Sequence, residues 1–85
     1  MNISNEIKIK VLKDELDQIG HVLRDIQTDV CITRQDKEFA TEDGELDEAE
    51  SCERSIIRSM KLYASYRNEE LDLMRRILSL GGTIS

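Results

Sequence analysis

The stretch IKVLKDELDQIGHVLRDIQTDV, residues 9–30, carries the strongest structural signal in this chain. Its apolar residues recur in alternating steps of three and four, the spacing that places side chains on one face of an α-helix and defines the a and d positions of a coiled-coil heptad. These residues are Ile9, Leu12, Leu16, Ile19, Leu23, Ile26 and Val30. The pattern predicts a long helix with a narrow apolar seam.

We place this first helix over about residues 4–36. Ser4 is of a type that caps helix N-termini, and Glu6 puts a negative charge in the first turn, where the helix dipole favours it. Gly20 is the weak point, because glycine inside a helix costs about 1 kcal/mol relative to alanine.

The second half of the chain contains another heptad series. Its members are Ile57, Met60, Ala64, Arg67, Leu71, Met74 and Leu78. Thr41 and Asp43 are candidate N-caps, and Gly81 with Gly82 forms a C-terminal stop, because glycine adopts the left-handed conformation at low cost. We therefore predict a second helix at about 43–80, an acidic turn at about 37–42 before it and a short tail at 81–85.

The two series become complementary when the chain folds back at this turn. If the numbers of facing residues add to 83, the pairs are Ile26 with Ile57, Leu23 with Met60, Ile19 with Ala64, Leu16 with Arg67, Leu12 with Leu71 and Ile9 with Met74. This is the layer rule of an antiparallel coiled coil. The predicted fold is an all-α, antiparallel two-helix hairpin in a single domain. Arg67 is expected to reach Glu15 or Glu70, or to extend along its aliphatic stem so that its charge stays in solvent. The rival, one unbroken helix, is disfavoured by Gly44 and its acidic neighbours.

Composition agrees with a helical, water-exposed molecule. The 85 residues include no proline and no tryptophan, only 4% are aromatic, and 35% are charged. Such a composition argues against a many-stranded β fold and suits long solvated helices. No apolar run approaches the roughly 20 residues that cross a bilayer, so we expect a cytoplasmic protein without a membrane partner.

The net charge of −6 is concentrated in the middle of the sequence. Residues 35–50 carry eight acids and one lysine, whereas residues 51–85 carry six bases and four acids. An acidic chain of this kind disfavours general binding to nucleic acid. The acids near the turn form a candidate docking tip for a basic partner: Glu42, Asp43, Glu45, Asp47 and Glu48.

A second group of apolar residues is left uncovered in the predicted register. It contains Val22, Ile56, Tyr63, Tyr66 and Ile77. A hairpin of this size has a marginal core, and an exposed apolar strip usually marks an interface. We therefore predict that these residues form an oligomer or partner face, with self-association into a four-helix bundle or a higher oligomer. A heterologous partner on the same strip is the competing interpretation.

The sequence contains no recognisable catalytic, cofactor or metal motif. His21 is the only histidine, and no zinc-type ligand set accompanies Cys31 and Cys52, which we interpret as free thiols. Arg54, Arg58 and Lys61 form a basic series that, with the tyrosines, offers a candidate site for a small anionic ligand. We predict a non-catalytic protein-interaction module that regulates, inhibits or chaperones a larger protein. The alternative is a nucleotide or nucleic-acid binder that uses the basic series.

Overall fold

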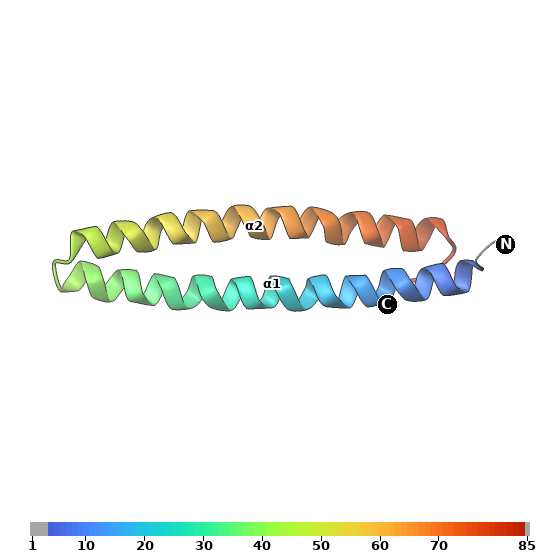
Figure 1. Cartoon of the computed structure of the whole chain (residues 1–85), viewed down its shortest axis with the longest axis horizontal. Coiled ribbons are helices and arrows are strands. Elements are labelled where there is room, and N and C mark those ends of the chain that lie inside the picture. Colours follow the sequence, from blue (N-terminus) through green and yellow to red (C-terminus); the bar gives the residue numbers. More distant parts are fainter. Residues whose placement is uncertain (1–3, 85) are drawn as a thin grey trace.

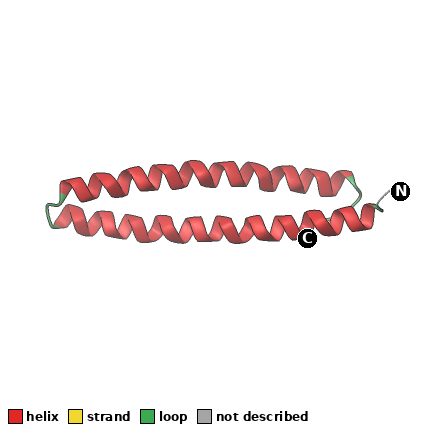
Figure 2. Ribbon diagram, viewed as in Figure 1, coloured by secondary structure: helices red, strands yellow, loops and turns green. Residues whose placement is uncertain are grey.

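The chain folds into an all-α helical hairpin, which confirms the predicted fold class. The computed structural model describes residues 4–84, in which α1 spans Asn5–Glu42 and α2 spans Leu46–Ser79. The two helices run antiparallel, side by side along their whole length, and a short turn joins them at one end (Figures 1 and 2). The molecule is a rod of 63 × 19 × 16 Å. Ser85, the last residue of the predicted tail, lies outside the described residues.

Helix α1 begins where the sequence predicted. Ser4 is the N-cap, with extended backbone, and its side chain accepts a hydrogen bond from the Ile7 amide. Glu6 lies in the first turn, where its charge complements the positive end of the helix dipole. These local interactions satisfy backbone groups that the first turn leaves without a partner.

The turn lies later in the sequence than predicted. Thr41 is still helical, and its hydroxyl donates to the Lys37 carbonyl, so it caps nothing. Gly44 has a φ of 75°, its amide donates to the Thr41 carbonyl, and the Glu45 amide donates to the Ala40 carbonyl. This is the Schellman arrangement, in which a glycine in the left-handed region ends a helix. The turn predicted at 37–42 is therefore wrong, and so are both N-caps proposed for the second helix: the N-cap is Glu45.

The C-terminal end of α2 repeats the same motif. Gly81 has a φ of 89°, its amide donates to the Leu78 carbonyl, and the Gly82 amide donates to the Ile77 carbonyl. A methyl group on Gly82 would lie 2.8 Å from Ile77 Cγ2 and 3.1 Å from Ile9 Cγ2. The glycine pair thus ends α2, as predicted, and brings the tail against the start of α1.

The seam predicted for the first helix agrees with the observed burial. Leu23 and Ile26 are buried, and the other five members of the 9–30 series are half-buried. The same spacing continues through Thr33 and, beyond the predicted helix end, through Lys37 to the buried Ala40. The helical period therefore located the core face of α1 from the sequence alone.

The seam predicted for the second helix is wrong: each residue that faces α1 comes one position earlier in the sequence than the residue predicted to do so. The buried and half-buried residues with heptad spacing along α2 are Ala49, Cys52, Ile56, Ser59, Tyr63, Tyr66, Glu70, Leu73 and Ile77, and Leu80 continues the series at the C-cap. Ile77 is completely buried, whereas its neighbour Leu78 is 57% exposed. Of the members predicted to face α1, only Met74 is half-buried; Ile57, Met60, Ala64, Arg67 and Leu71 are exposed.

The misplaced turn explains this error. Gln27 donates a hydrogen bond to the Tyr63 hydroxyl, and Lys37 pairs with Glu53, so the numbers of these partners add to 90 and not to 83. These contacts lie beside layers of the two buried series whose numbers add to 89, such as Ile26 with Tyr63 and Leu23 with Tyr66. That sum exceeds the predicted one by six, one residue less than a heptad, so with the turn centred on Gly44 α2 is shifted along α1 and rotated by one residue, about 100° around its axis. That rotation buries the series with the larger total of bulky apolar and aromatic side chains.

The face predicted for self-association is consequently the core of the hairpin. Ile56 and Ile77 are buried, and Val22, Tyr63 and Tyr66 are half-buried. Ile56 and Ile77 are therefore not free to contact another copy of the chain. The interpretation of these five residues as an exposed oligomer face is wrong, because core and outer face on α2 exchange places when the helix rotates.

Candidate protein-interaction surface

An apolar series with heptad spacing lies on the outside of α2. We call it the exposed stripe; its members are Ile57, Met60, Ala64, Arg67, Leu71, Met74 and Leu78. Ile57 is 45% exposed, Met60 53% and Leu78 57%. Over its 22 residues the stripe is about 33 Å long at 1.5 Å per residue. It is a coiled-coil seam in its spacing, and α1 leaves all of its members exposed except the half-buried Met74.

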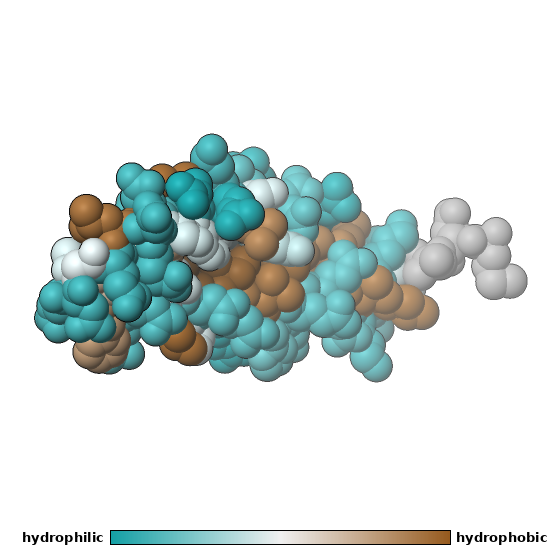
Figure 3. All heavy atoms as spheres, turned by 60° about the vertical axis from the view of Figure 1, so that its left-hand side comes forward, coloured by the Kyte–Doolittle hydropathy of each residue, from teal (hydrophilic) through white to brown (hydrophobic). Residues whose placement is uncertain are grey.

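Apolar side chains reach the surface of the rod between polar ones, as Figure 3 shows from the turn end. Single exposed apolar residues are ordinary, but a contiguous row of them marks an interface. The stripe is such a row, because steps of three and four keep its members on one side of the helix.

One charged residue lies within the stripe, and the hairpin itself provides its counter-ion. Arg67 forms an ion pair with Glu70, in agreement with one of the two predicted partners. The Glu70 side chain is only 13% exposed and belongs to the buried seam, and its Oε1 is shielded from solvent. The charged residue in the buried seam is thus Glu70 and not Arg67. Arg67 contacts the Glu70 carboxylate from the exposed side of α2.

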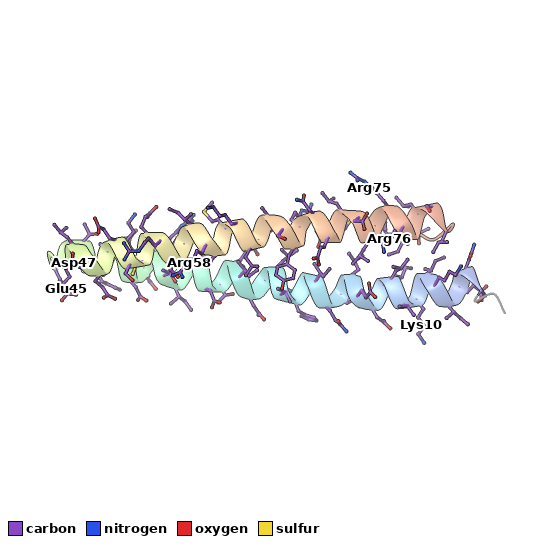
Figure 4. All side chains as sticks on the ribbon, turned by 45° about the horizontal axis from the view of Figure 1, so that its top comes forward. Lys10, Glu45, Asp47, Arg58, Arg75 and Arg76 are labelled. Atoms are coloured by element: carbon purple, nitrogen blue, oxygen red, sulfur yellow. The ribbon has the colours of Figure 1, made fainter. Side chains whose placement is uncertain are left out.

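Basic residues border the stripe on its outer side. Arg54, Lys61 and Arg75, which we call the basic flank, occupy a position that repeats every seventh residue, with Asn68 as its fourth member. All three are exposed, and Arg75 projects from α2 away from α1 (Figure 4). From Arg54 to Leu78, the stripe and this position together contain four bases and no acid. This side of α2 is therefore positive in a chain whose net charge is −6.

The ion pairs of α2 leave most of the basic flank free. Arg54 lies 4.0 Å from Glu50, and Arg76, outside the flank, lies 3.1 Å from Asp72. Among residues 4–84, neither Lys61 nor Arg75 has a carboxylate within 4.0 Å. These two cations are available to an acidic partner.

A shallow groove between the helices adjoins the stripe at Met60. Its lining comprises Ile26, Gln27, Val30, Cys31, Arg34, Met60 and Tyr63. Arg34 and Met60 also line the next depression towards the turn, where Glu38, Glu42 and Glu53 join them. The groove is thus apolar with a basic edge at Arg34, and it becomes acidic towards the turn.

The acidic tip lies where the shifted turn places it. Its five predicted residues are all exposed, and Glu45 and Asp47 lie at the turn end of the rod in Figure 4. Two large apolar residues are exposed in the same region, Phe39 at 59% and Leu46 at 68%. The predicted carboxylates are therefore clustered at the turn. Three of them, Glu45, Asp47 and Glu48, come after Gly44, at the N-cap and in the first turn of α2.

The predicted anion site is only partly assembled. Arg54 and Arg58 line a small open depression with Ile57, and Lys61 is exposed further along α2. The tyrosines do not complete a stacking surface, because both are half-buried in the seam and Tyr63 accepts a hydrogen bond from Gln27 at 3.2 Å. The basic side chains are thus separated from the aromatic rings that a nucleotide site needs.

The reactive side chains of the described residues do not form a recognisable centre. Both cysteines are free; Cys31 is exposed, and Cys52 is buried in the seam. His21 is exposed and its Nδ1 lies 2.8 Å from Arg24 Nη2. Within residues 4–84 no group of three or more His, Cys, Asp or Glu side chains has a metal-binding arrangement. No helix in this range is long and apolar enough to span a membrane.

Comparison with known proteins gave no match. No family model matches the chain, and neither a curated protein nor a solved structure shows significant similarity to it. The surface of the hairpin is therefore the basis for any statement about function.

The sequence pattern identified the residues of the stripe, but the prediction placed them in the core against the first helix and not on the exposed side of the second. The pattern did not connect the basic flank to the stripe. Arg54 and Lys61 were assigned, together with Arg58, to a separate candidate anion site. A seven-residue period through Arg54, Lys61 and Arg75 was the signal that connects them to a heptad seam.

Proposed function

We propose that this protein is a non-catalytic interaction module, a helical hairpin that presents the exposed stripe to a helix of a larger protein and so regulates or scaffolds it. The observation that carries the proposal is a second heptad seam on α2, outside the hairpin core and exposed at Ile57, Met60, Leu71 and Leu78. Helix-in-groove and coiled-coil recognition use this spacing of anchors.

The construction of the hairpin supports this role. One helix, α1, has its seam satisfied within the molecule, while α2 carries a seam on each of two neighbouring faces. A marginal two-helix core gains stability when a third helix covers further apolar area, so partner binding and folding stability are coupled.

The test uses two double variants, each of which replaces two exposed aliphatic residues by aspartate. Ile57→Asp with Leu71→Asp places charges in the stripe, and Val11→Asp with Ile32→Asp places them on exposed apolar positions of α1. Because all four side chains are at least 38% exposed, both variants are expected to keep the helical circular dichroism of the parent chain.

Each tagged protein is used to capture partners from an extract of its source cells, and captured proteins are purified for calorimetry with the full chain. The proposal expects a partner whose binding is lost with the α2 variant and kept with the α1 variant. Equal binding of that partner to both variants would show that the stripe is not the docking surface.

A further inference from the structure

We infer that the exposed stripe recognises an acidic amphipathic helix, one whose narrow apolar seam is bordered by Asp and Glu. The inference rests on the proposed function and adds the chemical character of the partner. Its basis is the coincidence of a heptad-spaced apolar row with a basic flank that has the same period.

The width of the stripe favours a helix as its occupant. Apolar residues occupy two positions per heptad, at steps of three and four, and the next position on the outer side is basic or Asn68. A coiled-coil seam has this narrow form, whereas a helix that lies on a membrane needs a wider apolar face of 100° or more. The stripe therefore fits a helical ridge better than a bilayer surface.

The charge of the border specifies the sign of the partner. Residues that flank a heptad seam set partner choice through ion pairs with the flanks of the opposing helix. Lys61 and Arg75 have no carboxylate partner among the described residues, and Arg34 adds a positive side chain at the groove beside Met60. Acidic flanks on the incoming helix would pair with these cations.

A second copy of the chain fits the same stripe poorly. Antiparallel pairing of two stripes aligns Ile57 with Met74 of the second copy, and the flanks then bring Arg54 close to Arg75 of that copy. Parallel pairing in register places Arg67 opposite Arg67. Like charges at these positions destabilise a coiled coil, so the flank disfavours the antiparallel arrangement and Arg67 disfavours the parallel one.

The groove also gives the docked helix a boundary. Towards the turn, Glu38, Glu42 and Glu53 join Arg34 in the lining, and Lys37 is already paired with Glu53, so acidic side chains outnumber the free basic ones. An acidic helix therefore matches the surface from about residue 54 to residue 78 and is repelled beyond it.

The experiment uses two synthetic peptides of four heptads as probes. Both have Ile at a and Leu at d; one has Glu at every e and g position, and the other has Lys there. Like charges keep each peptide from pairing with itself. Binding to the full chain is measured by calorimetry, and helix induction in the peptide by circular dichroism, at low and at physiological salt.

The expected result is at least tenfold tighter binding of the Glu peptide than of the Lys peptide, about 1.4 kcal/mol, with the difference reduced by salt. The variant Lys61→Glu with Arg75→Glu should reverse this order. The control Lys8→Glu with Arg76→Glu changes the net charge equally but lies off the stripe and flank, so it should preserve the order.

Equal binding of the two peptides, or an unchanged order of affinities in the variant Lys61→Glu with Arg75→Glu, overturns the acidic-helix inference. The docking role of the stripe is tested separately, by the capture experiment described above. If the chain bound anionic phosphatidylserine vesicles more tightly than the Glu peptide, and the variant Ile57→Asp with Leu71→Asp lost that binding, the surface would be assigned to a membrane. A dimer in light scattering that dissociates in the stripe variant would assign it to a second copy. Either outcome overturns the inference.

Discussion

At the scale of single residues, Glu70 and Arg67 connect the two faces of α2. Glu70 occupies a seam position among apolar and aromatic neighbours, and its countercharge comes from a half-exposed residue of the stripe. A buried carboxylate without its cation is costly, whereas replacement of the whole pair by apolar side chains is often neutral or stabilising. We therefore expect the pair to contribute little net stability compared with apolar side chains in its place.

This reasoning predicts opposite effects of single and double substitution. Arg67→Leu should lower the free energy of unfolding by about 1–3 kcal/mol, because it leaves Glu70 with an unpaired buried charge. Arg67→Leu with Glu70→Leu should restore it to the parent value or exceed it. Urea unfolding followed by circular dichroism measures both; a double variant as unstable as the single one would contradict this account of the pair.

Gly20 is a position where a substitution should stabilise the hairpin. It lies inside α1 with negative φ, and a methyl group built on it would have no atom within 4 Å. Gly20→Ala should therefore raise the free energy of unfolding by about 1 kcal/mol, the difference in helix propensity.

The matched control is Gly44→Ala, which also meets open space but sits at a φ of 75°. A β-carbon is strained in that region, so this change should destabilise the hairpin by about 1 kcal/mol. Thermal unfolding of the two variants separates helix propensity from turn geometry. Stabilisation by both substitutions would contradict the left-handed turn at Gly44.

At the scale of elements, α2 contains two heptad series one residue apart, and the rotation of the helix decides which is core. Ile56 and Ile57 give a matched comparison, since they have the same side chain and adjacent positions, yet they are 6% and 45% exposed.

Ile56→Ala should cost about 2–4 kcal/mol because it removes buried methyl groups, while Ile57→Ala should cost less than about 1 kcal/mol. Chemical unfolding of the two variants, with Ile32→Ala on α1 as an exposed control, measures the difference. The reverse order of stabilities would restore the register first predicted from the sequence.

At the scale of the whole molecule, the hairpin is distinguished from its rival by length. The folded rod has a longest extent of 63 Å and a Cα radius of gyration of 18.5 Å. One continuous helix from Asn5 to Ser79 would be roughly 110 Å long, with a radius of gyration of roughly 30 Å.

Small-angle X-ray scattering at low protein concentration should therefore give a radius of gyration near 18.5 Å, increased slightly by side chains and hydration. A concentration series controls for association. A value near 30 Å with the mass of one chain would contradict the hairpin.

The sequence alone predicted the helical class, the antiparallel arrangement, the core face of α1, the N-cap at Ser4 and the glycine stop after α2. All of these except the antiparallel arrangement depend on a local pattern, periodicity or cap chemistry, that neighbouring residues specify. The antiparallel arrangement follows from two such patterns on either side of one turn. Gly44 was a further local signal, and its choice as the residue that ends α1 would have placed the turn correctly.

Only the tertiary structure decided which side of α2 is core and which is the interaction surface. Two apolar series on one helix are equivalent in a linear pattern, and a turn misplaced by a few residues rotates the helix enough to exchange them. The choice depends on how the helices pack against each other over their full length, where Tyr63, Tyr66 and Ile77 fill the seam and Arg67 remains outside. Packing is a property of both helices together, and for that reason the position of the candidate site followed from the fold and not from the residues that compose it.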